Sequence, residues 1–146
     1  MAGAKALFSH DQVNAIKVAV EAAEQETSGE IRVHIEETTG GKDVMDRAAQ
    51  VFAILELQHT RQRNGILFYL AVEDHLFAVI GDKGINAVVP AGFWDNIKDY
   101  MAAHFREGKF AEGLAGGIHK AGLALAEHFP FHRDDINELS DEISFG

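Results

Sequence analysis

Several residue types and segments are missing from this sequence of 146 residues. It contains no cysteine, which excludes disulfides, thiolate metal sites and cysteine nucleophiles. Its longest apolar run, residues 65–72, is far shorter than the roughly 20 residues that a membrane-spanning helix needs. The first fifteen residues include Lys5, His10 and Asp11 and lack the apolar stretch of a secretory signal. We therefore expect a cytoplasmic protein that makes no contact with membranes.

Positive charge is also scarce. The sequence has 13 Lys and Arg residues against 23 Asp and Glu residues, a formal net charge of −10. A field of that sign repels the phosphates of nucleic acids and anionic membranes, and it attracts cations. The isolated Arg61, Arg63 and Lys109 form no basic cluster that would offset it. We therefore expect no nucleic-acid partner.

What is present suits one folded domain followed by a short tail. Hydrophobic residues make up 47% of the chain, enough for one core, and neither a repeat nor a linker interrupts residues 1–130. Residues 131–146 are polar and acidic, and they are either loose or a short helix against the edge of a sheet. This acidic tail is the candidate contact with a protein partner. The sequence makes no prediction of the oligomeric state.

The spacing of apolar residues predicts four helices, over residues 9–26, 43–55, 90–108 and 110–129. Ser9 and Gln12 have the spacing of a capping box, and Asp43 suits the position before a helix. Pro90 is typical of a helix start, and Pro130 ends the last helix.

Alternation of apolar and polar residues predicts a strand over residues 30–36 with one wet or partly covered face. Residues 65–72 are apolar on both faces, as in a central strand. Residues 76–80 return as an antiparallel hairpin, and residues 85–89 form one more short strand. Since a strand, helix, strand unit crosses over right-handed, the first two strands are expected to be parallel. The predicted fold is a three-layer α/β/α sandwich with a mixed central sheet flanked by helices.

This topology predicts two polar rims, one at each end of the sheet. The first gathers Glu30, Arg63, Asn64, Asp82, Lys83 and Asn86, and the second gathers Glu36, Glu37, Thr38, Thr39, Asp43, Asp74 and His75. Oxygen-rich clusters of this kind suit Ca²⁺ or Mg²⁺. The metal ligands expected first are Glu30, Asn64 and Asp82, and the second candidate cluster is Glu36, Asp43 and Asp74.

Each rim also has a purely structural interpretation. Asp82 and Gly84 can build a tight turn, Asp43 can cap a helix and Asp74 can lie in a hairpin turn. The glycines around Asp82 favour the first rim, because they free the backbone to aim polar groups inward. The second rim lies at the carboxyl ends of the parallel strands, where ligands of open α/β sheets tend to bind. The two arguments conflict.

Other catalytic patterns are missing. The histidines show no H-E-x-x-H spacing, and we expect His34 on the outer or half-covered face of its strand. There is no G-x-S-x-G and no nucleotide-binding glycine pattern after a strand. Residues 39–42 are too short for a phosphate loop and are interpreted as an ordinary loop. The hydroxyl of Tyr69 needs a hydrogen-bond partner if the strand is covered.

Four segments together resemble the TPM-domain family. They are Thr27–Val33, Arg63–Leu67, Phe77–Ile85 and Phe105–Phe110, the last followed by Gly113 and Gly117. The resemblance covers roughly residues 8 to 130. The C-terminal residues Asn137–Ser144 are similar to the ending of a short, free-standing bacterial branch of that family.

The resemblance implies an α/β/α sandwich with a mixed sheet. A plant relative in the thylakoid lumen has been assigned acid phosphatase activity, calcium binding and a role in photosystem II repair. Asn86 and Ala91 stand where relatives commonly carry acids, whereas Asp82 adds one inside the loop. If phosphatase chemistry carries over, Asp82 or Asp74 would hold the metal, and Arg63 or Lys83 would orient the phosphate.

The main functional expectation is therefore a TPM-like domain that binds a divalent cation, Ca²⁺ or Mg²⁺, at an oxygen-rich rim of the sheet. One alternative is a metal-assisted acid phosphatase, which rests on the family resemblance only. Another is a non-catalytic module that binds a protein partner, for which the acidic tail is the candidate.

Overall fold

The computed structural model describes residues 8–131 and 143–145. The elements in chain order are α1 (His10–Glu24), β1 (Glu30–Glu36), α2 (Val44–Ile54), the 3-10 helix η2 (Leu57–His59), β2 (Gly65–Ala71), β3 (Leu76–Gly81), α3 (Lys83–Asn86), α4 (Phe93–Arg106), α5 (Phe110–His128) and β4 (Ser144–Phe145). Residues 132–142, most of the predicted acidic tail, lie outside the described residues. In the described part of the chain, no helix is long and apolar enough to cross a membrane.

Local sequence signals place the ends of the first two long helices. The Ser9 side chain accepts from the backbone of Gln12 while the Gln12 side chain accepts from the backbone of Ser9, so the predicted capping box is confirmed. Asp43 caps α2 by accepting from the backbone N–H groups of Met45 and Asp46. Both caps satisfy helix N–H groups that have no partner within the helix.

The sheet has the strand order β3-β2-β1-β4. Strands β1 and β2 are parallel, with Glu30 opposite Gly65, and α2 lies on the crossover between them. Strands β2 and β3 form the predicted antiparallel hairpin, with Ile66 opposite Gly81. The predicted mixed sheet is confirmed.

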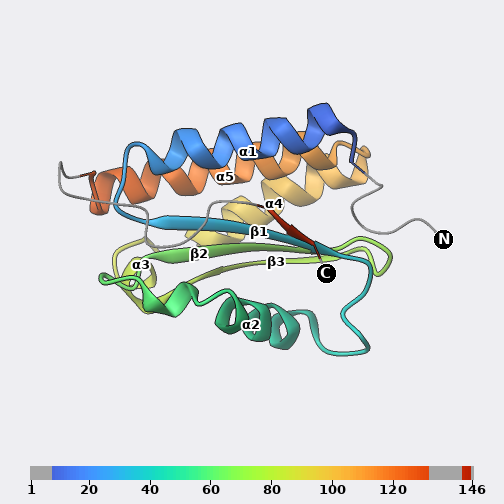
Figure 1. Ribbon diagram of the computed structural model, residues 1–146, viewed down its shortest axis with the longest axis horizontal. Coiled ribbons are helices and arrows are strands. Elements are labelled where there is room, and N and C mark those ends of the chain that lie inside the picture. Colours follow the sequence, from blue (N-terminus) through green and yellow to red (C-terminus); the bar gives the residue numbers. More distant parts are fainter. Residues whose placement is uncertain (1–7, 132–142, 146) are drawn as a thin grey trace.

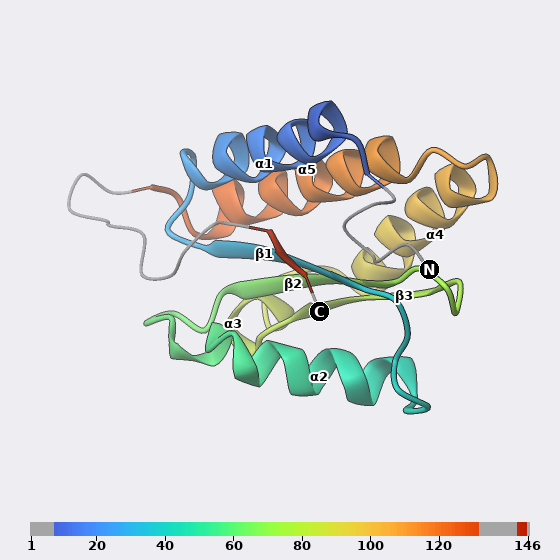
Figure 2. The ribbon, with the colours of Figure 1, turned by 45° about the vertical axis from the view of Figure 1, so that its right-hand side comes forward.

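Helices cover both faces of this sheet. Figures 1 and 2 show α1, α4 and α5 on one face and α2 on the other. The larger core lies on the three-helix side and includes Ile31, Val33, Ile35, Ile66, Phe68 and Leu70. The smaller core lies under α2 and includes Ala48, Val51, Leu67 and Tyr69. The α/β/α sandwich is confirmed.

The predicted short strand over residues 85–89 is wrong. A single helical turn, α3, takes its place, because the Asp82 carboxylate accepts from the backbone N–H of Lys83 and caps that turn. Gly84 lies so close to the preceding loop that a Cβ there would come within 2.0 Å of the Gln62 carbonyl oxygen. Only glycine permits this approach of two backbones.

The short strand β4 was not predicted from the sequence. Ser144 and Phe145 pair in parallel with His34 and Ile35 of β1, and Phe145 packs against the larger core. This pairing extends the sheet on the side of β1 away from β2 (Figure 1). Neither a loose tail nor a helix describes these two residues.

Candidate functional site

The residues of the first predicted rim lie around Gly65. Glu30 is opposite Gly65 in the β1–β2 register, and Asn64 precedes it in the chain. The backbone N–H of Asp82 donates to the Gly65 carbonyl oxygen at 2.9 Å. Glu30, Asn64 and Asp82 therefore share one end of the sheet, which we call the Asn64 rim.

At this rim Asp82 is already paired with protein groups. Arg63 donates to it through both Nε, at 2.5 Å from Oδ2, and Nη2, at 2.9 Å from Oδ1. Hydrogen bonding to Asp82 raises the pKa of Arg63. The Arg63 side chain is nevertheless 38% exposed, whereas the Asp82 side chain is 8% exposed. Arg63 and Lys83 were the two residues predicted to orient a phosphate. Arg63 binds the Asp82 carboxylate, and Lys83 is exposed.

The Asn64 side chain is buried at this rim with only part of its hydrogen-bonding capacity used. The residue is 1% exposed, and its Nδ2 donates to Ser28 Oγ at 3.3 Å. Its Oδ1 is buried and accepts no hydrogen bond in the described structure. A buried acceptor without a hydrogen bond costs about 1–3 kcal/mol of folding free energy. A ligand that bound this amide oxygen would recover part of that cost.

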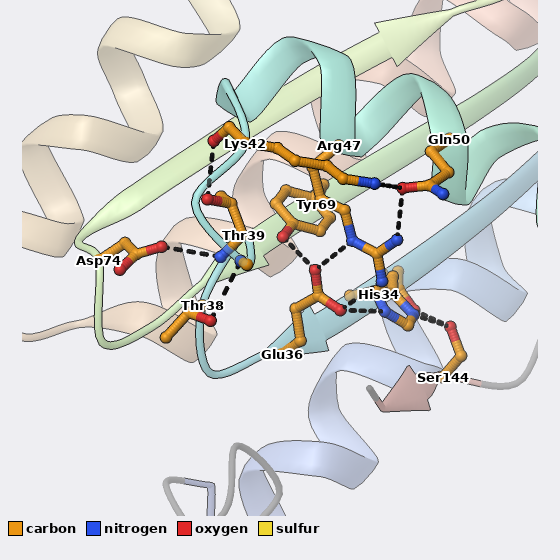
Figure 3. Close-up of polar contacts among 12 residues, drawn as sticks. His34, Glu36, Thr38, Thr39, Lys42, Arg47, Gln50, Tyr69, Asp74 and Ser144 are labelled. Carbon is orange, nitrogen blue, oxygen red and sulfur yellow. Dashed lines mark hydrogen bonds and ion pairs between the residues drawn. The ribbon is translucent and has the colours of Figure 1, made fainter.

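The opposite end of the sheet holds a compact polar cluster of His34, Glu36, Arg47, Tyr69 and Ser144, which we call the Glu36 cluster (Figure 3). Arg47 donates two hydrogen bonds to the Glu36 carboxylate, from Nε to Oε2 at 2.8 Å and from Nη2 to Oε1 at 2.9 Å. The Tyr69 hydroxyl also donates to Oε2. His34 bridges the cluster to β4, with Nε2 3.3 Å from Glu36 Oε1 and Nδ1 2.7 Å from Ser144 Oγ.

The electrostatics of this cluster fix its protonation. Burial alone would raise the pKa of Glu36, but hydrogen bonds from Arg47, Tyr69 and His34 lower it to about 2. Burial, together with the hydrogen bond to Glu36, raises the pKa of Tyr69. Burial also lowers the pKa of His34, although Glu36 opposes that shift. Glu36 is therefore a carboxylate whose two oxygens are both bound by protein donors, which suits a structural anchor rather than an acid or base.

The predicted position of His34 needs correction. All seven residues of β1 are buried, including the face that was expected to be wet or partly covered. The Tyr69 ring stacks on the imidazole of His34, while Arg47 reaches across from α2 and Ser144 from β4. These side chains replace water as partners of the polar residues, so the strand can be polar and buried together.

The second candidate metal cluster is spread over three separate interactions. Glu36 binds Arg47, Asp43 caps α2, and Asp74 accepts from the backbone N–H of Thr39 at 2.8 Å. Across residues 8–131 and 143–145, no three or more His, Asp or Glu side chains form a group that could hold a metal ion. The Asn64 rim combines two carboxylates with one amide oxygen, so it is not a group of three His, Asp or Glu side chains.

The loop after β1 encloses a hollow of about 220 Å³ lined by Thr38, Thr39, Gly40, Lys42 and Arg47. Its polar groups are mostly used inside the protein: the Thr39 hydroxyl donates to the Lys42 carbonyl, and Lys42 and Arg47 both donate to Gln50 (Figure 3). The interpretation of residues 39–42 as an ordinary loop agrees with these contacts.

Sequence reasoning missed Arg47 and Ser144 as partners in the Glu36 cluster. Two signals pointed toward such partners: Tyr69 on a covered strand needed an acceptor, and β1 carried a polar side chain at every second position. Neither signal names the partner, since Ser144 is 110 positions from His34.

The fold and these two polar ends define an α/β sandwich with a mixed sheet and helices on both faces. The family model of the TPM domain matches residues 3–123. The chain therefore belongs to the TPM-domain family, as the resemblance implied. No match was found among curated proteins.

Solved structures agree with this assignment. The BA42 protein of the psychrophilic bacterium Bizionia argentinensis is 48% identical, with 95% of each chain covered and a TM-score of 0.87. The N-terminal domain of a P. gingivalis protein is 23% identical, covers 87% of this chain and 83% of its own, and has a TM-score of 0.63. The N-terminal domain of cg2496 from Corynebacterium glutamicum is 14% identical, with coverages of 93% and 79% and a TM-score of 0.61. The last two show likeness of fold alone.

Proposed function

We propose that this TPM domain binds a divalent cation, Ca²⁺ or Mg²⁺, at the Asn64 rim. The observation that carries the proposal is the buried Asn64 Oδ1, which accepts no hydrogen bond from the described residues. It belongs to the same end of the sheet as the carboxylates of Glu30 and Asp82. The Glu36 cluster offers no such oxygen on its central carboxylate, because protein donors bind both.

The residues of the rim fit a hard cation. Ca²⁺ and Mg²⁺ prefer carboxylate and amide oxygens and complete their coordination with water. Glu30, Asn64 and Asp82 supply oxygens of both kinds, and the net charge of −10 raises the local concentration of cations. A bound cation would supply positive charge at this rim and satisfy the Asn64 oxygen.

Arg63 competes with the cation, because its guanidinium occupies both oxygens of Asp82. We expect binding to displace Arg63, whose partly exposed side chain can turn toward solvent. The variant Arg63→Gln should therefore bind the cation about tenfold more tightly, since it removes a positive charge next to the site. Arg61→Gln removes the same charge two positions away and should change affinity much less.

The test is a titration of the full chain with Ca²⁺ or Mg²⁺, followed residue by residue by NMR. Saturable shifts at Asn64, Gly65 and Asp82, strengthened in Arg63→Gln but not in Arg61→Gln, would support the proposal. Shifts confined to Asp43 and Asp74, or none at either end of the sheet, would contradict it.

The alternatives stay predictions. For an acid phosphatase, the described residues offer no observation that favours the reaction: Arg63 is engaged by Asp82, and Glu36 is held as an anchored carboxylate. Hydrolysis of p-nitrophenyl phosphate with Mg²⁺ or Ca²⁺ tests that activity. A protein-binding module using the acidic tail concerns residues that lie largely outside the described structure. The predicted cytoplasmic location and the expected absence of a nucleic-acid partner also stay predictions.

A further inference from the structure

A second cavity lies at the β2–β3 turn, on the face of the sheet that carries α4 and α5. Its volume is about 210 Å³, and its walls are the apolar side chains of Leu70, Val72, Phe77, Ala102, Phe105 and Phe110. We call it the hairpin pocket. It is at the opposite end of β2 from the Asn64 rim, about 20 Å away along a strand of this length. The two sites are therefore independent.

Aromatic rings form much of the wall. Phe77 and Phe105 meet edge to face with centroids 4.9 Å apart and an interplanar angle of 81°. Phe105 and Phe110 are 5.3 Å apart with their planes at 31°. Rings that meet in these orientations offer both edges and faces to a further flat ring.

Two basic residues lie at the rim of the pocket. Arg106, the last residue of α4, and His75, in the β2–β3 turn, both line the pocket and are exposed. No acidic side chain of the described residues lines it. Arg106 has neither a hydrogen bond nor an ion pair from its side chain among the described residues, unlike Arg47 and Arg63, which each hold a carboxylate.

We propose that the hairpin pocket binds a small aromatic carboxylate, with the ring among the phenylalanines and the carboxylate on Arg106. The size is suitable, because an engineered apolar cavity of about 150 Å³ holds benzene, and this one has room for a ring with a short acidic arm. The charge is also suitable, because a guanidinium presents parallel N–H groups that match a carboxylate. An apolar wall below a guanidinium that no described carboxylate binds selects a ligand that combines both features.

The test uses the full chain and two probes of similar shape, phenylacetate and benzyl alcohol, followed by residue-resolved NMR. Phenylacetate should give saturable shifts at Leu70, Val72, Ala102 and Phe105. Benzyl alcohol, which lacks the charge, should bind about tenfold more weakly, the usual advantage of a charge-assisted hydrogen bond. Phenylacetate shifts that map elsewhere, or do not saturate, would overturn the proposal.

Two variants separate the charge from the cavity. Arg106→Gln keeps the exposed position but removes the charge, so phenylacetate should bind it no better than benzyl alcohol. Lys98→Gln, on the same helix, removes the same charge from a side chain paired with Asp95, and it should bind phenylacetate like the wild type. If Arg106→Gln also binds phenylacetate like the wild type, the proposed site is wrong.

Ala102→Leu fills the pocket and should abolish the binding of both probes. Its folding is checked by the dispersion of its amide spectrum, and Arg106→Gln carries the test if it does not fold. Concentration-dependent shifts of the pocket amides without any probe would show that a second copy of the chain fills the pocket, which would contradict the proposal.

Discussion

The two ends of the sheet place charged groups in different ways. In the Glu36 cluster, one carboxylate receives hydrogen bonds from Arg47, Tyr69 and His34, and every partner lies on a packed element. At the Asn64 rim, Asp82 is bound by a partly exposed Arg63, and the buried oxygen of Asn64 accepts no hydrogen bond from residues 8–131 or 143–145. The comparison separates a satisfied network, which stabilises the fold, from an incomplete one, in which the proposed cation would supply the missing partner.

The largest expected effect is at the satisfied end. Glu36→Gln leaves the Arg47 guanidinium without its anion and places an amide N–H₂ against donors, so the free energy of unfolding should fall by about 3–4 kcal/mol. Denaturant unfolding measures this loss. Glu37→Gln makes the same chemical change one position later and should stay within about 0.5 kcal/mol of the wild type. Equal effects of the two variants would show that the Glu36 cluster is not a stabilising network.

The next largest effect is a dependence of the unfolding free energy on pH. Because the pKa of Glu36 is lowered from 4.5 to about 2 on folding, its contribution is present above pH 4.5 and is lost as the pH falls toward 2. The contribution amounts to about 3 kcal/mol at neutral pH. The difference in unfolding free energy between wild type and Glu36→Gln should therefore shrink over this pH range. A difference that does not change with pH would contradict the assigned ionisation.

The smallest effect is expected at the Asn64 rim. Asp82→Asn weakens the pair with Arg63 and the cap of α3, and together these should cost about 1–2 kcal/mol of unfolding free energy. Asp95→Asn, on an exposed pair with Lys98, provides the matched control and should have little effect. If Asp82→Asn costs as much as Glu36→Gln, the two ends do not differ in the way described.

The predictions that succeeded depend on neighbours in the chain. The capping box at Ser9, the cap at Asp43 and the alternation along β1 are local patterns, and each lies where it was expected. The prediction that Glu30 and Asp82 share one end of the sheet also succeeded, because strand direction and order follow from the succession of local elements.

The predictions that failed depend on contacts between distant segments. Residues 85–89 look like a strand by composition, but the cap at Asp82 and the close approach of Gly84 to the preceding loop turn the chain into α3. The expectation of a wet or partly covered face on β1 failed because its polar side chains find partners on α2, β2 and β4. The alternation of apolar and polar residues does not distinguish a polar side chain that contacts water from one that binds another side chain.

By itself, the sequence determined the helices and main strands, the mixed sheet and the family, since periodicity and capping act over a few residues. The tertiary structure alone decided which polar oxygens of the described residues receive a hydrogen bond and which, Asn64 Oδ1 among them, do not. It joined Tyr69 to Glu36 across 33 positions and His34 to Ser144 across 110, while Asn64 Oδ1 received no such partner within the part of the chain that the structure describes. Hydrogen bonds depend on distances of about 3 Å, and only the folded chain fixes such distances between remote residues.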